Sequence, residues 1–236
     1  MRYLGLCFDH MHMGDLLRLV ADTPGCSIAG IYDPDIRKMS AAIETHSIPA
    51  NRVFTDLQTA FAEAGADAAI VCSTTAEHAN ITVAAFEAGL HVICEKPLAK
   101  DLHEAEELVE IAAKSGLVNA VHFNLRYYPM VRQMKVMREK GELGEVYSIM
   151  GSYLQDWLFL QTDYNWRLEP DKSGDSRAIA DIGSHLLDIT EYVTGLKITA
   201  VMADFSTVHK TRLKPLKAIE TYSGKMLTPA DYQEVP

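Results

Sequence analysis

Residues 88–99 read AGLHVICEKPLA, which places a helix stop, a strand and a polar strand end in direct succession. Gly89 follows the amphipathic stretch Ala76–Ala88, as expected of the residue after a helix. His91–Cys94 is short and nearly all apolar, which is typical of a strand covered on both faces. The strand runs into Glu95-Lys96-Pro97, at the edge where open α/β sheets bind ligands. This succession favours a parallel α/β sheet.

The same alternation of apolar runs and amphipathic stretches extends through the first half of the chain. We expect further strands at Tyr3–Phe8, Ser27–Tyr32, Ala68–Cys72 and Val118–Asn124, and a weaker one at Arg52–Phe54. We expect helices at His12–Ala21, at Asp35–Thr45, from a Thr55–Gln58 capping box to Ala64, and from Asp101 to Ser115. Residues 1–122 are therefore predicted to form one Rossmann domain, with a doubly wound parallel sheet that binds a nucleotide.

The second half of the chain has a different pattern. It suggests a helix near Met130–Lys140, a turn at Gly141–Gly144, and long alternating runs at Val146–Trp157 and Ile198–Val208 that we expect to be antiparallel strands. The tail from Lys210 to Pro236 contains no convincing element. Residues 123–236 are therefore predicted to form an α+β substrate domain with a mostly antiparallel open sheet. The sheet would be incomplete, because two strands leave its edges open.

The composition narrows the choice of partners. The chain has 22 Lys and Arg against 32 Asp and Glu, a net charge of −10, and no basic run, which argues against nucleic acid. No apolar stretch approaches the roughly 20 residues needed to cross a membrane. The start of the chain is a poor signal peptide, so we expect a cytoplasmic protein. The cysteines form no CxxC pair and are expected to be reduced: Cys7, Cys26, Cys72 and Cys94.

The turn after the first expected strand lacks the glycine-rich motif of dinucleotide-binding folds. Asp9 is a poor neighbour for a pyrophosphate, although a protonated His10 or His12 could offset its charge. His10-x-His12 also has the spacing of two zinc ligands at a strand end, as in metal-dependent amidohydrolases. A single His-x-His is more often structural, so we expect no metal site.

Two other strand ends carry candidate ligand-binding residues. Asp33 follows the second strand, where a carboxylate would bind the adenosine ribose and favour NAD over NADP. The alternative is that Asp33-Pro34-Asp35 forms a turn and a helix cap. Ser73-Thr74-Thr75 follow the fourth strand. The pair Glu95-Lys96 after the fifth strand has a plain alternative as a surface ion pair.

A later stretch carries a third candidate group. Asp181, His185 and Asp188 are spaced i, i+4 and i+7, so on a helix they share one face. Apolar residues occupy the rest of this helix, which makes the polar stripe more than a solvated surface. The alternative is a capped and hydrogen-bonded helix start.

These motifs together resemble the Gfo/Idh/MocA family of NAD(P)-dependent sugar and cyclitol dehydrogenases. Residues 88–99 resemble the family's strand-five signature, and Thr74–His78 and the Asp181-x-Gly-x-His185-x-x-Asp188 motif add independent support. The likeness runs from residue 1 to about residue 225. Family members usually continue well past the end of this chain, so we expect a shortened second domain.

The resemblance implies a hydride transfer between a nicotinamide cofactor and a hydroxyl or carbonyl of a sugar, cyclitol or related polyol. It implies that Lys96 and His185 serve proton transfer and that Asp181 binds substrate or orients the site. We expect NAD, with NADP less favoured, and a homo-oligomer formed through the second-domain sheet. The residues expected to bind the cofactor are Cys7, Phe8, Asp9, His10, Asp33, Ser73, Thr74, Thr75, His78, Glu95, Lys96, Asn124, Trp166 and Arg167.

Two other functions remain open. One is a non-catalytic relative that binds a nucleotide or polyol as an accessory protein, which the glycine-poor turn favours. The other, less favoured, is a metal-dependent hydrolase.

Overall fold

The computed structural model describes residues 1–217 and 227–236, so part of the tail after Lys210 lies outside the described residues. The described residues form two compact units. The N-terminal unit comprises Met1–Asn124 and Pro170–Asp181, and the C-terminal unit comprises Leu125–Glu169 and Ile182–Pro236.

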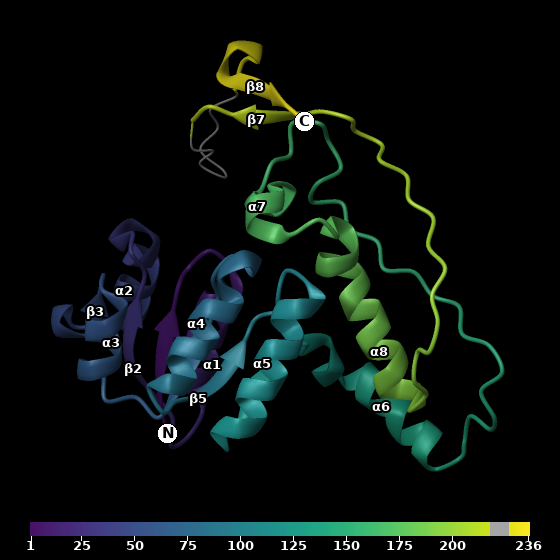
Figure 1. Cartoon of the computed structure of the whole chain (residues 1–236), viewed down its shortest axis with the longest axis horizontal. Helices are drawn as coiled ribbons and strands as arrows, with labels where there is room; N and C mark the ends of the chain where they lie inside the picture. The colour runs from purple at the N-terminus through teal and green to yellow at the C-terminus, as the bar shows by residue number, and fades with distance from the viewer. Residues whose placement is uncertain (218–226) are drawn as a thin grey trace. The chain divides into compact units, whose positions relative to one another are not determined.

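A six-stranded parallel sheet forms the centre of the N-terminal unit (Figure 1). Its strand order is β3-β2-β1-β4-β5-β6. The strands are β1 (Arg2–Leu6), β2 (Ser27–Tyr32), β3 (Val53–Phe54), β4 (Ala68–Val71), β5 (His91–Cys94) and β6 (Asn119–Val121). All neighbouring strands pair in parallel, which confirms the predicted α/β fold with a doubly wound sheet.

Helices connect these strands. They are α1 (His12–Asp22), α2 (Ser40–His46), α3 (Leu57–Glu63), α4 (Thr75–Glu87) and α5 (Leu102–Ser115), with a short 3₁₀ helix, Ile36–Met39, before α2. The expected capping box at Thr55 is wrong. Asp56 is the N-cap of α3, because its carboxylate accepts a hydrogen bond of 2.8 Å from the backbone N–H of Thr59.

The core lies on both faces of the sheet. On one face, Val71 packs with residues of α3 and α4, and on the other Ile70 packs with residues of α1 and α2. Successive residues of β4 point to opposite faces, so a strand buried on both sides must be apolar throughout. The two packed layers hold the carboxyl ends of the strands in place.

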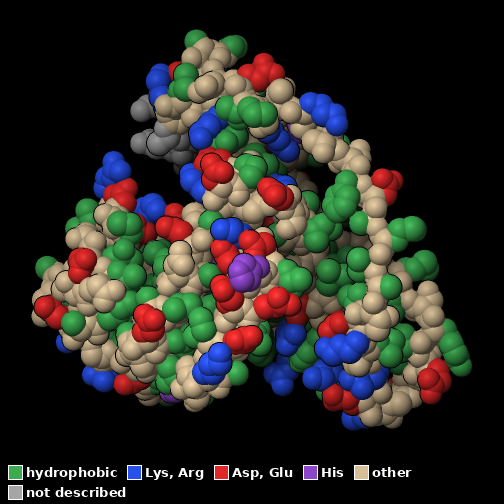
Figure 2. All heavy atoms as spheres, viewed as in Figure 1, with side chains coloured by type: hydrophobic (Ala, Val, Ile, Leu, Met, Phe, Trp, Pro, Cys, Tyr) green, Lys and Arg blue, Asp and Glu red, His purple; other side chains and the backbone are tan. Residues whose placement is uncertain are grey.

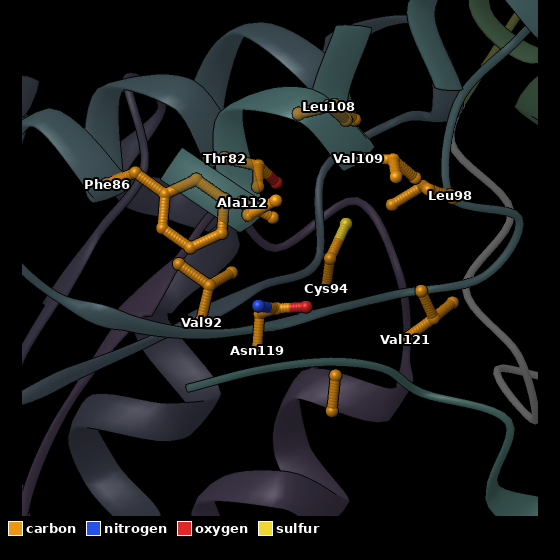
Figure 3. A pocket seen from close by; sticks show the side chains of 12 residues that line it. Thr82, Phe86, Val92, Cys94, Leu98, Leu108, Val109, Ala112, Asn119 and Val121 are labelled. Atoms are coloured by element: carbon orange, nitrogen blue, oxygen red, sulfur yellow. The ribbon is translucent and has the colours of Figure 1, made fainter. Parts of the chain in front are cut away.

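A cavity of about 350 Å³ lies between α4, α5, β5 and β6 (Figure 3). Its lining is mostly aliphatic and aromatic, with Thr82, Cys94 and Asn119 as its polar side chains. Burial raises the pKa of the Cys94 thiol to about 12, so this group is neutral at ordinary pH. The cavity therefore offers shape and apolar surface, but no charged group for chemistry.

The C-terminal unit contains the helices α6 (Pro129–Glu139) and α8 (Ser184–Thr194), which pack against each other. A two-stranded antiparallel sheet is formed by β7 (Arg212–Pro215) and β8 (Tyr232–Val235). The N-terminal unit also contains the short helix α7 (Pro170–Ser173), which packs against α4. A π-helical turn at Ile179–Gly183 leads into α8 along the chain.

The strand predictions for the second half are wrong in their positions. Residues 146–157 and 198–208 form no strand, and side chains such as Tyr147 and Met202 are almost fully exposed. An extended segment becomes a strand only when a partner satisfies its backbone groups, and alternation of side chains alone supplies no partner. The antiparallel pair occurs instead in the tail, where the sequence suggested no element.

The distribution of charged side chains on the surface agrees with the absence of a basic run in the sequence. Figure 2 shows acidic and basic side chains interspersed over the face in view. Among the described residues, no helix has both the length and the apolar character that a membrane span requires.

Candidate active site

The register of the parallel sheet places several predicted residues at one edge. Leu6 lies opposite Val71, Val71 opposite Cys94, and Cys94 opposite Val121. Because these strands end in register, the residues that follow them share the carboxyl edge of the sheet, where α/β folds bind ligands.

A buried ion pair joins Lys96 to Asp181 within the N-terminal unit. Lys96 follows β5, and its Nζ donates hydrogen bonds to Oδ1 of Asp181 at 2.8 Å and to the backbone oxygen of Asp181 at 2.9 Å. Only 5% of Lys96 and 7% of Asp181 is exposed. Lys96 is therefore not part of a surface pair with Glu95, and that alternative is wrong. An ammonium held on a buried carboxylate can stabilise negative charge or exchange a proton.

Glu95 lies among three imidazoles. Its Oε1 accepts hydrogen bonds from Nδ1 of His12 at 2.8 Å and Nδ1 of His122 at 2.6 Å, and Nε2 of His10 lies 3.9 Å from Oε2. Burial alone would raise the pKa of Glu95, but the hydrogen bonds from His12 and His122 and the nearby His10 hold it well below its usual range. Glu95 is therefore a buried carboxylate.

His12 and His122 are absent from the residues predicted to bind the cofactor. His12 has a visible signal in the His10-x-His12 spacing. His122 has a weaker one, since it follows directly after β6 and shares the edge with Glu95.

The turn after β1 keeps an unusual backbone. Cys7 has a φ of 66°, in the left-handed region that favours glycine, and its N–H donates to the oxygen of Tyr32 at 2.8 Å. The next N–H, of Phe8, donates to Oδ2 of Asp33 at 2.8 Å. Burial raises the pKa of the Cys7 thiol, so this side chain is uncharged and contributes packing.

Asp33 is fully buried, and both of its carboxylate oxygens accept backbone hydrogen bonds of 2.8 Å, from Phe8 and from Asp35. These bonds match the interpretation of Asp33 as the residue that holds a turn. A contact between Asp33 and a ribose stays a prediction. Nearby, Nζ of Lys38 lies 2.7 Å from Oδ1 of Asp9 and offsets its charge.

Ser73, Thr74 and Thr75 lie buried at the junction of β4 and α4. His78, in the first turns of α4, has Nδ1 at 2.7 Å from the oxygen of Pro97 and Nε2 at 3.2 Å from the oxygen of Ser73. The Lys96–Pro97 peptide bond is cis. His78 thus bridges the loop after β4 and the loop that carries Lys96.

The residues of this edge fit a nicotinamide dinucleotide. Asn124 has a buried Oδ1 with no hydrogen-bond partner among the described residues, an acceptor that a ligand N–H or O–H can satisfy. Cys7 keeps the left-handed turn backbone although it is not glycine. Lys38 offsets the carboxylate of Asp9, which would otherwise oppose a pyrophosphate.

The remaining predicted residues belong to the C-terminal unit. His185, in the first turn of α8, is buried, and its ring packs edge-on against Tyr153 at a centroid distance of 5.9 Å. Asp188 accepts hydrogen bonds from Arg126, a partner that the sequence did not suggest. The guanidinium of Arg167 lies 4.5 Å from the ring centre of Trp166.

Comparison with protein families identifies the chain. The family model described as "Oxidoreductase family, NAD-binding Rossmann fold" matches residues 7–123, and the one described as "GFO/IDH/MocA C-terminal domain" matches residues 131–228. The chain belongs to the Gfo/Idh/MocA family. The resemblance seen in the sequence is thereby confirmed.

Relatives within the family include sugar and cyclitol dehydrogenases. Levoglucosan dehydrogenase of Pseudarthrobacter phenanthrenivorans is 39% identical over 131 residues, which is 55% of this chain and 33% of that protein. Inositol 2-dehydrogenase of Corynebacterium glutamicum is 26% identical over 84% of this chain and 56% of that protein. The inositol dehydrogenase homolog of Azotobacter vinelandii, solved with NADH and myo-inositol, is 27% identical, with a TM-score of 0.72 over 83% of this chain and 52% of that one.

The chain thus spans about half the length of most of these relatives, and a third of levoglucosan dehydrogenase. The comparisons establish an oxidoreductase family with an NAD-binding domain and with sugar and polyol dehydrogenases among its members.

Proposed function

We propose that this chain is an NAD-dependent dehydrogenase or reductase that acts on a hydroxyl or carbonyl of a sugar, cyclitol or related polyol. The buried pair of Lys96 and Asp181, at the carboxyl edge of the sheet, carries the proposal. A buried ammonium has little reason to be retained for stability alone, because desolvating both charges offsets their attraction. A role for Lys96 at the reacting oxygen of a substrate would explain why the buried ammonium is present.

The roles of the three catalytic candidates follow from their chemistry. The ammonium of Lys96 stabilises negative charge on the substrate oxygen, and Asp181 holds that ammonium in place. His185, whose ordinary pKa is near neutrality, takes or returns the hydroxyl proton. The nicotinamide, when bound, accepts or donates the hydride.

We assign cofactor binding to the carboxyl edge and to the two residues of the C-terminal unit named in the sequence prediction, Trp166 and Arg167. We assign NAD rather than NADP. Asp33 and Asp35 place two carboxylates directly after β2, and they disfavour an additional 2′-phosphate. Arg37 does not reverse this preference, because its guanidinium pairs with Asp35 at 2.7 Å.

One observation favours a second function, that of a non-catalytic nucleotide- or polyol-binding relative. His12 and Asp9 occupy a turn where dinucleotide-binding folds carry glycine, and both are engaged by neighbours, His12 by Glu95 and Asp9 by Lys38. In this function the cofactor binds weakly and no substrate turns over.

Turnover with a panel of polyols separates the two functions. The purified chain is incubated with NAD⁺ and each of a set of sugars and cyclitols that includes levoglucosan and myo-inositol, and NADH formation is followed by absorbance. We expect NADH with at least one substrate, a loss of about 10²-fold or more in Lys96→Ala, and little change in Lys100→Ala, a more exposed lysine paired with Glu104. No turnover in the wild type, together with saturable NADH binding, would favour the accessory function.

We also propose a cytoplasmic, self-associating protein. All four cysteines are free, which suits a reducing compartment. The C-terminal unit leaves apolar side chains exposed, among them Tyr147, Met150, Met202 and Phe205, and a second copy could cover them. Sedimentation velocity should show a dimer or larger species, and a stable monomer at all concentrations would exclude self-association.

A further inference from the structure

Three imidazoles converge on one buried carboxylate in the N-terminal unit. We call His10, His12, His122 and Glu95 the histidine cluster. His10 precedes α1, His12 is its first residue, Glu95 follows β5 and His122 follows β6. The cluster is therefore assembled from three separate strand ends by the fold of the sheet.

The donor atoms of three members of this cluster lie at distances that suit a metal ion. Ring nitrogens of His10 and His12 and a carboxylate oxygen of Glu95 lie within 4.8 Å of one another. Zinc with bonds of about 2.0–2.1 Å separates its tetrahedral ligands by about 3.3 Å. The separations from Glu95 are 2.8 Å for His12, 2.6 Å for His122 and 3.9 Å for His10, so they lie on either side of that value.

The burial of the cluster suits an ion that enters from solvent. The side chain of Glu95 is fully buried and that of His10 is 6% exposed, whereas those of His12 and His122 are 23% and 17% exposed. An ion can therefore reach the ring nitrogens from one side while the carboxylate stays away from bulk water. A buried negative charge strengthens the attraction for a cation.

The chemical nature of the donors selects the ion. Imidazole nitrogens suit zinc, copper and nickel, whereas magnesium and calcium prefer oxygen donors. Two histidines and one glutamate are also a common ligand set for zinc. Nε2 of His10 lies 3.9 Å from Oε2 of Glu95, beyond hydrogen-bond distance, and an ion bound to both would bring them into one coordination sphere.

We propose that His10, His12 and Glu95 bind one divalent transition-metal ion of the zinc type, with His122 as the fourth protein ligand. The ion replaces the protons that Nδ1 of His12 and Nδ1 of His122 now donate to Glu95, and in each ring the proton moves to Nε2. In His10, Nδ1 now accepts a 3.2 Å hydrogen bond from the N–H of His12. Coordination through Nε2 places the proton on Nδ1 and gives up that hydrogen bond, so neutral imidazoles release no net proton.

This site shares His10 and Glu95 with the residues proposed to bind the cofactor, but its ligands do not include Lys96, Asp181 or His185. The test is therefore to measure metal binding by the whole chain in the absence of cofactor and substrate. The protein is prepared without a polyhistidine tag, stripped with a chelator, and dialysed against buffered Zn²⁺ at graded concentrations, and bound metal is measured by elemental analysis. Co²⁺ then replaces Zn²⁺, and its visible absorption reports the geometry of the ligands.

The matched variants are His12→Gln and His122→Gln in the cluster, and His103→Gln on the exposed surface of α5. We expect one Zn²⁺ per wild-type chain, a tetrahedral Co²⁺ spectrum, and an unfolding temperature that rises with Zn²⁺. Affinity should fall by about tenfold or more in His12→Gln and in His122→Gln, and stay unchanged in His103→Gln. Two cluster variants are used so that a folding defect in one leaves the other as the test.

Two results would overturn the proposal. One is less than a tenth of an ion per chain in the wild type at saturating Zn²⁺. The other is wild-type affinity in both cluster variants while their circular dichroism shows a folded chain, since the metal would then be bound elsewhere.

Discussion

The Nζ of Lys96 lies 2.8 Å from Oδ1 of Asp181, and both side chains are buried in the N-terminal unit. Lys96 follows β5, whereas Asp181 lies in a π-helical turn 85 residues later in the chain. The pair thus ties the second segment of this unit to the edge of its sheet.

Breaking this pair should destabilise the protein strongly. Lys96→Met removes the cation that donates hydrogen bonds to the buried Asp181, and it leaves Arg177, whose Nη1 lies 3.7 Å from Oδ2 of Asp181. We expect a loss of about 2 kcal/mol in the free energy of unfolding, because a hydrogen-bonded buried charge loses its nearest partner. The double variant Lys96→Met with Asp181→Asn also removes the charge of Asp181 and should recover part of that loss. Urea unfolding followed by circular dichroism measures both. Equal losses in the single and double variants would show that the pair itself is not the cause.

The turn after β1 should limit cofactor affinity through Asp9. Asp9→Gly removes a carboxylate from the turn that we propose faces the cofactor pyrophosphate, and it releases Lys38 from its pair with Asp9. We expect the Kd for NADH to fall by about fivefold, or about 1 kcal/mol. Asp15→Ala, at an exposed acidic residue in the first turn of α1, is the control and should change Kd little. An unchanged or weaker affinity in Asp9→Gly would remove Asp9 from the account.

The backbone of Cys7 should reject β-branched residues. At a φ of 66°, Cys7→Val adds steric strain in a buried position, and we expect a loss of about 2–3 kcal/mol. Cys7→Gly relieves the strain but loses a buried side chain, so its effect should be within about 1 kcal/mol. Cys72→Val, also buried but without a positive φ, is the matched control and should cost less than about 1.5 kcal/mol. Thermal unfolding of the three variants gives this order, and a reversed order of the two valine variants would contradict it.

His78 should make stability depend on pH. Burial holds the pKa of His78 below the value of about 6.5 for an unfolded histidine, so the unfolded chain binds more protons between the two values. Stability therefore falls as the pH is lowered through about 6.5, by at most about 1.4 kcal/mol per pH unit for this one group. In His78→Gln this part of the slope should disappear, although the variant also loses hydrogen bonds and starts less stable.

Unfolding curves between pH 7.5 and about 5 measure this slope. His103→Gln, which changes an exposed histidine on α5, should keep the wild-type slope. If the free energy of unfolding varied with pH in the same way in the wild type and in His78→Gln, His78 would have the same pKa in the folded and the unfolded chain, and the prediction would be wrong.

The fold of the N-terminal unit could be predicted because its signal is local. Each buried strand is a short apolar run bounded by a turn, and β2 and β5 match their predicted bounds. The prediction failed for residues 146–157 and 198–208, where alternation suggested strands. Pairing is a long-range property, and a sequence pattern does not show which partner an extended segment finds.

The site could be predicted in part for a related reason. Strand ends in a parallel sheet meet at one edge, so Lys96, Glu95 and Ser73 could be placed there from the sequence. The partner of Lys96 comes from a segment far along the chain, so that contact has no local signal, and the contact of His122 with Glu95 has only the weak signal of a shared sheet edge. At Asp33, backbone N–H groups donate hydrogen bonds to both carboxylate oxygens, so an acidic residue after β2 does not by itself indicate ribose binding.

We expect the carboxyl edge of this sheet to bind a nicotinamide dinucleotide. The most direct measurement is a titration of the purified chain with NADH and with NADPH, followed by nicotinamide fluorescence. The account predicts saturable binding of both or of NADH alone, with NADH tighter. No saturable binding of either at millimolar cofactor would contradict it, and NADPH tighter than NADH would overturn the assignment of NAD.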